Sequence, residues 1–81
     1  MKKKVLFRFE TQKRADSWIQ RVSDMFESQI EDIDMVDKSV EFSDAIYYFW
    51  DTTRDDGIEF DTEYNEPMFQ TALKGMTSSY K

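Results

Sequence analysis

The sequence predicts an α+β domain in which a small antiparallel sheet carries two helices on one of its faces. Two segments, at 12–28 and 65–76, show the apolar spacing of amphipathic helices. Outside them, apolar and charged residues alternate in short runs, as they do in strands that are buried on one side. With 81 residues the chain has room for one domain, which we expect to span residues 1–81.

The first predicted element is a strand near residues 4–10. Its residues Val5, Phe7 and Phe9 share one face, because they alternate with Leu6 and with charged residues. Thr11 is a suitable N-cap for the helix that follows, since its hydroxyl can accept a hydrogen bond from a first-turn amide. The apolar stripe of this helix comprises Ala15, Trp18, Ile19, Val22, Met25 and Phe26.

A hairpin is predicted after this helix. Ile33 and Met35 alternate with aspartates, a turn follows at 37–38, and Val40 and Phe42 continue the alternation. The two strands of this hairpin would each bury one face.

The next segment, AIYYFW at 45–50, allows two interpretations. As a helix capped by Ser43 or Asp44, it would give a ferredoxin-like β-α-β-β-α-β order plus a C-terminal helix. As a strand it has the aromatic content typical of strands, and a turn at 51–57 would return the chain to 58–64. We favour the strand, which gives the order β-α-β-β-β-α.

The stretch GIEFDTEY at 57–64 alternates almost perfectly between two kinds of residue. As a strand it would place Ile58, Phe60, Thr62 and Tyr64 on one face and three carboxylates on the other. Asn65 can then cap the last helix. The apolar stripe of that helix comprises Met68, Phe69, Ala72, Leu73 and Met76.

Charge is distributed unevenly along the chain. Residues 24–66 contain fifteen of the seventeen acids and, as bases, only Lys38 and Arg54, a net charge of −13. The first 23 residues are basic, and we expect them to neutralise part of the acidic sheet from within. This asymmetry indicates an interaction surface, although a solvated sheet face would have the same alternation.

Several classes of function lack the residues they need. The chain has no Cys and no His, which excludes thiolate zinc sites and Ser-His or Cys-His nucleophiles. The loop 51–61 resembles a calcium-binding loop, but Asp56 stands where such a loop requires glycine. We therefore expect no enzyme, no metal and no cofactor. With no signal peptide and no long apolar run, the sequence favours a soluble, cytoplasmic protein.

The acidic strands themselves provide a functional hypothesis. Alternate carboxylates on a strand lie about 6.6 Å apart at a rise of ~3.3 Å per residue. Nucleic acid also presents a row of single charges, one per ~3.4 Å of axis on each strand. The candidate binding carboxylates are Asp32, Asp34, Glu41, Asp55, Asp56, Glu59, Asp61 and Glu63. The candidate aromatic anchors of the same interface are Tyr47, Tyr48 and Trp50.

Two resemblances agree with this hypothesis. In size, acidity and lack of catalytic groups, the chain resembles the small anti-restriction and anti-CRISPR proteins of phages, which share a strategy and no motif. The segment SDAIYY at 43–48, followed by DDGI at 55–58, is similar to the Tyr-Tyr segment of the colicin nuclease immunity proteins. That similarity implies Tyr47 and Tyr48 at an interface with a basic nuclease. Phe49 replaces the proline of that family, and the N-terminal strand departs from its all-helical fold.

The sequence thus predicts a non-enzymatic acidic inhibitor, which binds a basic, nucleic-acid-binding protein and imitates DNA. It would contact neither nucleic acid nor a membrane directly, and it could form a homodimer. The alternative is a generic acidic, homo-oligomeric interaction domain without nucleic-acid mimicry.

Overall fold

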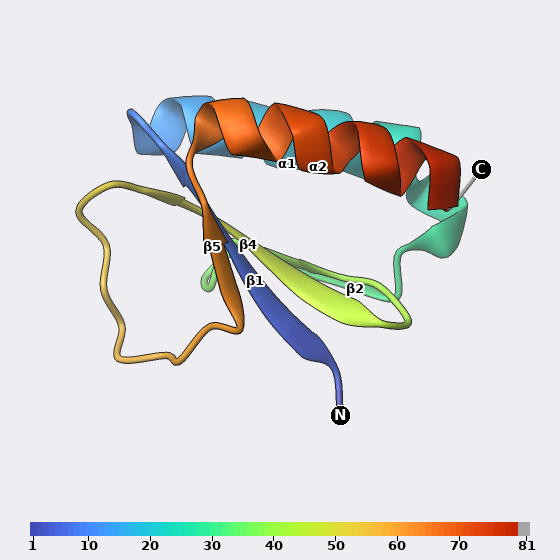
Figure 1. Cartoon of the computed structure of the whole chain (residues 1–81), viewed down its shortest axis with the longest axis horizontal. Coiled ribbons are helices and arrows are strands. Elements are labelled where there is room, and N and C mark those ends of the chain that lie inside the picture. Colours follow the sequence, from blue (N-terminus) through green and yellow to red (C-terminus); the bar gives the residue numbers. More distant parts are fainter. Residues whose placement is uncertain (80–81) are drawn as a thin grey trace.

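The computed structural model describes residues 1–79, and for Ser79 only the backbone. Its elements, in chain order, are β1 (Lys3–Phe9), α1 (Gln12–Met25), the short 3-10 helix η1 (Glu27–Gln29), β2 (Asp32–Asp34), β3 (Ser39–Glu41), β4 (Ala45–Asp51), β5 (Thr62–Tyr64) and α2 (Glu66–Ser79). The predicted α+β class is confirmed, as is the position of both helices on one face of the sheet (Figure 1). Within the described residues, no helix is both long and apolar enough to cross a bilayer.

The sheet is mixed, so the expectation of a purely antiparallel sheet was wrong. Its strand order is β2-β3-β4-β1-β5, with β1 in the centre and parallel to both of its neighbours. The strands β2, β3 and β4 form an antiparallel meander. Residues 45–50 are a strand, as favoured, and the ferredoxin-like alternative is wrong because no helix forms there. The observed order β-α-β-β-β-β-α, with the short η1 after α1, has one strand more than the predicted order.

The main core lies between the helices and the sheet. Phe69 of α2 is fully buried, and its ring centroid lies 4.6 Å from that of Phe7 and 5.0 Å from that of Trp18 on α1. Both predicted caps are confirmed: the Thr11 hydroxyl accepts a hydrogen bond from the first turn of α1, and the Asn65 side chain does the same for α2. Two residues of the predicted helix stripes, Met25 and Met68, are exposed.

The second face of the sheet has a smaller core of its own. Leu6, Tyr48 and Trp50 are buried there, and Ile58 and Phe60 pack on them. These two residues belong to the segment 52–61, which connects β4 to β5 on the side away from the helices (Figure 1). We call this segment the crossover.

The crossover corrects the prediction of a long strand at 58–64. Only Thr62–Tyr64 is a strand, and Phe60 and Tyr64 pack on opposite faces of the sheet. A hairpin from β4 directly to 58–64 would leave the apolar face at Leu6 and Trp50 uncovered, which is unfavourable because buried apolar area stabilises the fold.

Chain handedness explains why the crossover takes this face. The first parallel connection runs from β1 through α1 to β4, and the second runs from β4 over β1 to β5, in the opposite direction across the sheet. Parallel connections are almost always right-handed. Two crossover connections that run in opposite directions across a sheet can both be right-handed only if they pass over opposite faces. Because α1 lies on one face, the connection from β4 to β5 passes over the other.

Candidate functional site: the acidic face

The predicted carboxylates come together on one side of the molecule. Strand register places Asp32, Asp34 and Glu41 on the sheet face away from the helices, and Glu63 lies opposite Leu6 on the same face. The other predicted carboxylates belong to the crossover that covers this face. The acidic face, as we use the term, comprises Asp32, Asp34, Glu41, Asp55, Asp56, Glu59, Asp61 and Glu63.

Basic residues near the N-terminus neutralise part of this face, as the sequence predicted. The Lys2 ammonium lies 2.6 Å from a carboxylate oxygen of Glu31 and 2.5 Å from one of Glu41. These two hydrogen bonds raise the pKa of Lys2 above its usual value. Arg8 of β1 donates to Glu63 of β5 at 2.8 Å, so Glu41 and Glu63 are both ion-paired.

Other carboxylates of the face hold the backbone in place. Asp34 accepts hydrogen bonds from the amides of Val36 and Asp37 and so shapes the β2–β3 turn. Asp55 accepts from the amide of Gly57, whose φ of 76° is in the region that favours glycine. Asp61 accepts from the Lys4 amide at 2.8 Å.

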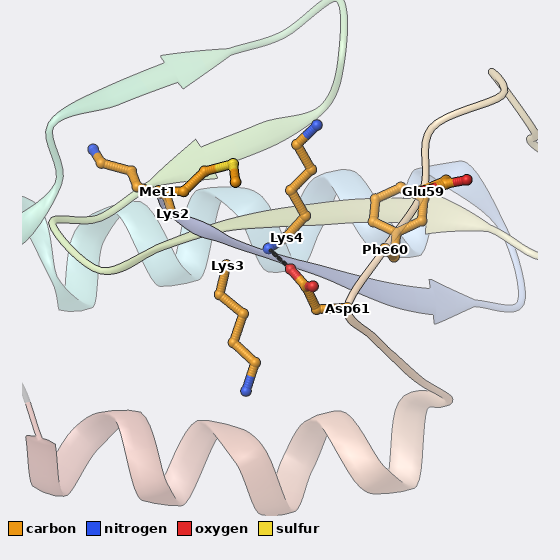
Figure 2. Close-up of a pocket in the computed structure, with 7 residues that line it drawn as sticks. All are labelled: Met1, Lys2, Lys3, Lys4, Glu59, Phe60 and Asp61. Atoms are coloured by element: carbon orange, nitrogen blue, oxygen red, sulfur yellow. Dashed lines mark hydrogen bonds between the residues drawn. The ribbon is translucent and has the colours of Figure 1, made fainter.

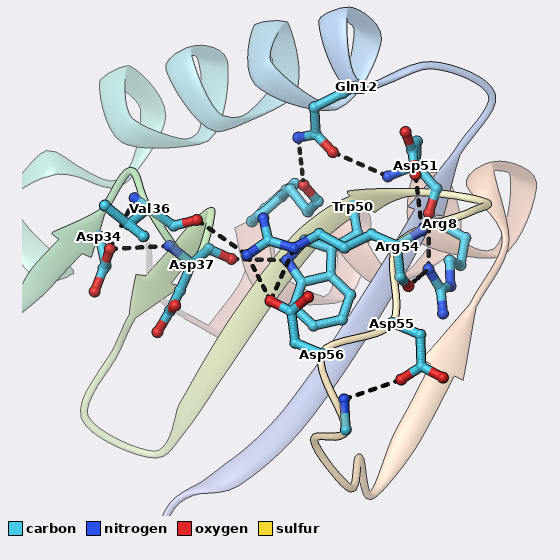
Figure 3. A network of polar contacts seen from close by, with 12 residues as sticks. Arg8, Gln12, Asp34, Val36, Asp37, Trp50, Asp51, Arg54, Asp55 and Asp56 are labelled. Atoms are coloured by element: carbon cyan, nitrogen blue, oxygen red, sulfur yellow. Dashed lines mark hydrogen bonds and ion pairs between the residues drawn. The ribbon is translucent and has the colours of Figure 1, made fainter.

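A polar network joins the crossover to the sheet and to the β2–β3 turn (Figure 3). The Arg54 guanidinium donates to the Val36 carbonyl and to Asp56, and it lies 4.6 Å from the Trp50 ring centroid. The Trp50 indole donates to the Asp37 carbonyl at 2.7 Å. Sequence reasoning missed this role of Arg54, whose only signal was that it is one of two bases within the acidic block.

The carboxylates that remain are the ones free to meet a partner. Asp32 and Glu59 are exposed, and neither carboxylate has a hydrogen bond or ion pair within the described part of the chain. Asp55 and Asp61 are exposed too, but each accepts a backbone amide and so belongs with the carboxylates that hold the fold. The face therefore divides into carboxylates that build the fold and carboxylates available for binding.

The buried Tyr48 hydroxyl lies near several carboxylates, which affect its pKa. Burial raises the pKa of the Tyr48 hydroxyl, and the charges of Asp37, Asp34 and Glu41 raise it further. Carboxylates disfavour the phenolate because it would add a like charge. The three carboxylates that act on Tyr48 all come from the β2–β3 hairpin.

Two of the three predicted aromatic anchors are buried. Trp50 is 1% exposed and Tyr48 is 7% exposed, both beneath the crossover. Tyr47 points to the other face, where its ring stacks on Phe7 with centroids 5.5 Å apart. As exposed anchors Tyr48 and Trp50 were predicted wrongly, because an apolar run cannot reveal that a later segment covers this face of β4. Tyr47 is only partly buried, so its role at an interface stays a prediction.

A hollow of about 580 Å³ opens where β1 begins. It is lined by Met1, Lys2, Lys3, Lys4, Glu59, Phe60 and Asp61. Figure 2 shows Lys3 and Lys4 pointing away from each other on opposite sides of β1. Since its charges have both signs and Lys2 is already held by two glutamates, the hollow does not form a concentrated anion site.

Across residues 1–79 the structure holds no group of three or more potential metal-ligating side chains. Comparisons with protein-family models, with curated proteins and with solved structures return no match for this chain.

Proposed function

We propose that the chain is a non-enzymatic, cytoplasmic inhibitor that binds a basic, nucleic-acid-binding protein through the acidic face. The observation that carries the proposal is the gathering of eight sequence-predicted carboxylates on one side of the sheet and its crossover. A surface of this kind attracts proteins that grip phosphates, and the attraction weakens as salt screens it. Binding would occupy the site that DNA or RNA normally fills.

The test of the proposal should change only carboxylates of the acidic face that do not support the fold. Reversing Asp61 or Glu63 would disturb the fold, because these residues hold Lys4 and Arg8. Asp32 and Glu59 have no such role, so the double variant Asp32→Lys/Glu59→Lys changes the surface alone. The matched control is Glu10→Lys/Asp24→Lys, which makes the same change in net charge at two other exposed carboxylates.

The experiment is affinity capture on the purified, immobilised chain at low salt. We expect nucleic-acid-binding proteins to be retained, to elute at high salt and to be displaced by added DNA. The Asp32→Lys/Glu59→Lys variant should lose this capture, and the control should keep it. Equal capture by both variants, or capture that ignores salt and DNA, contradicts the proposal.

A second candidate function rests on different residues. Several large apolar side chains are exposed, among them Met25, Ile33, Met35 and Val36. Such residues favour a homo-oligomeric interaction domain, the alternative to DNA mimicry. Sedimentation across a range of concentrations, read together with the capture experiment, separates the two. A salt-resistant dimer that captures no nucleic-acid-binding protein supports the alternative, whereas salt-sensitive capture, by a monomer or a dimer, supports the acidic inhibitor.

A further inference from the structure

The strand β2 forms one outer edge of the sheet. In the described chain it pairs only with β3, and the connecting turn contributes Met35 and Val36 to the surface beside it. An edge strand presents unpaired backbone groups that can accept another strand. The side chains and the backbone of this edge together indicate what kind of strand would fit.

The backbone of Ile33 points out of the sheet. The Glu31 amide donates to the Glu41 carbonyl at 2.8 Å, so Glu41 directs its carbonyl toward β2. Residues of an antiparallel strand direct their backbone groups to alternate sides. The backbone N–H and C=O of Val40 therefore point toward β4. Ile33 lies opposite Val40, so its N–H and C=O point away from β3, to the outer edge of the sheet.

The side chains at this edge are of two kinds. Ile33 is 41% exposed, Met35 is 50% exposed and Val36 is 82% exposed. Asp32 and Asp34 flank Ile33 and point to the acidic face, and within the described residues the Asp32 carboxylate makes no hydrogen bond or ion pair. The edge thus offers backbone hydrogen bonds, an apolar contact and negative charge in alternation.

The charges beside Ile33 favour a basic partner over a second copy of the chain as the strand that pairs with β2. Antiparallel pairing of two β2 strands about Ile33 would place Asp32 opposite the second copy's Asp34 at both ends. Like charges directly opposite each other destabilise a strand pair. An extended segment with basic residues facing these aspartates and an apolar residue facing Ile33 would meet favourable contacts at every position.

We propose that the β2 edge binds an extended segment of a partner protein, with alternating basic and apolar residues, which adds to the sheet as a sixth strand. The inference rests on the proposed function, because it specifies how the basic partner docks. Backbone hydrogen bonds would then set the register, and the aspartates would select basic side chains.

The test uses three variants of the full chain and a fluorescent peptide in which Lys and Val alternate. Ile33→Pro removes the outward N–H while leaving the ladder to β3 intact, because proline is tolerated where a strand N–H faces solvent. Ile33→Val is its matched control, since it keeps the N–H and most of the apolar contact. Asp32→Lys tests the charge. The peptide is also made with N-methyl groups that block strand pairing without changing its charge.

We expect the wild type to bind the alternating peptide about tenfold more tightly than the N-methylated one, the value of one backbone hydrogen bond of ~1.4 kcal/mol. Ile33→Val should bind the unmethylated peptide as tightly as the wild type does. Ile33→Pro should bind it about tenfold more weakly, because proline lacks the N–H that donates to a peptide carbonyl. Asp32→Lys should weaken binding of both peptides. Circular dichroism verifies that each variant is folded. Equal binding of the two peptides by the wild type, or binding of the unmethylated peptide by Ile33→Pro as tight as by the wild type, overturns the inference.

Failure of this inference is distinguishable from failure of the proposed function. If Ile33→Pro still captures nucleic-acid-binding proteins in a salt-sensitive way, the acidic face binds by charge and the β2 edge is not the docking strand. If the wild type captures none, the proposed function itself fails.

Discussion

The two faces of the sheet are both apolar, but they are covered in different ways. The helix side buries a large aromatic cluster in which Phe69 alone contacts Phe7, Phe9, Trp18 and Phe49. The other side is covered by the crossover, in which only Ile58 and Phe60 supply apolar contact. The comparison teaches that one face stabilises the domain, whereas the thin cover of the other face leaves its outer surface available for carboxylates.

Removing a ring from the helix side should have the largest effect on stability. Phe69→Ala leaves a cavity among four aromatic rings, and such truncations cost about 3–5 kcal/mol. That is comparable to the total stability expected of so small a domain, so the variant should be largely unfolded. Phe69→Leu, a milder change, should fold and melt at a lower temperature. Thermal unfolding followed by circular dichroism measures both, and a native-like melting temperature for Phe69→Ala would contradict this ranking.

Removing a ring from the crossover should cost less and act locally. Phe60→Ala loses contact with the rings of Tyr48 and Trp50, whose centroids lie 5.1 and 5.3 Å from that of Phe60. We expect a loss of about 1–3 kcal/mol. Hydrogen exchange should accelerate in the crossover while α1 and α2 remain protected. Equal acceleration in the helices would mean that the two faces unfold as one unit.

The two faces of the sheet differ in how much of their structure could be predicted from the sequence. Helical spacing and the caps Thr11 and Asn65 were sufficient to predict both helices, because those signals are local. Parallel pairing of β1 with β5 could not be predicted, since alternation in residues 58–64 specifies a face without specifying a neighbour. The same limitation hid the burial of Trp50, whose cover comes from residues later in the chain.

The acidic face could be predicted in part. Alternation placed Asp32, Asp34 and Glu41 correctly on one face of the sheet, because they lie in regular strands. The division between structural and available carboxylates could not be foreseen, since it depends on partners such as Lys2 and Arg8 that are distant in sequence.

Breaking the polar network should have a smaller effect than removing Phe60. Arg54→Ala loses the hydrogen bond to the Val36 carbonyl and the contact with the Trp50 ring, each of which contributes about 1 kcal/mol. We expect faster hydrogen exchange at residues 52–57 and in the β2–β3 turn together. Lys74→Ala, on the exposed side of α2, is the matched control and should change neither. Acceleration confined to residues 52–57 would show that Arg54 does not connect the two segments.

Protonation of Asp51 at low pH should reduce the free energy of unfolding, because its carboxylate holds the first residues of the crossover. Hydrogen bonds from the Thr53 hydroxyl and amide hold the pKa of Asp51 below its usual range. A carboxyl with a lowered folded-state pKa stabilises the fold above its unfolded pKa, and this contribution is lost as the pH falls through the folded value. Asp51→Asn should therefore be less stable than the wild type near pH 7, and the gap should narrow below about pH 4. Urea unfolding at both pH values measures the gap, and a constant gap would contradict the assignment.

Reversing the available carboxylates should change stability least. Asp32→Lys/Glu59→Lys removes no interaction within the described chain, so its free energy of unfolding should stay within about 0.5 kcal/mol of the wild type. The same variant should lose partner binding. A large loss of stability would mean that these carboxylates support the fold.

The central claim is that the acidic face binds a basic partner by charge. The most direct measurement is the dissociation constant of a captured partner as a function of salt, for the wild type, Asp32→Lys/Glu59→Lys and Glu10→Lys/Asp24→Lys. We predict that affinity falls steeply with salt for the wild type and the control, and that the face variant binds about tenfold more weakly at low salt with a shallower salt dependence. Identical curves for the two variants would contradict the claim.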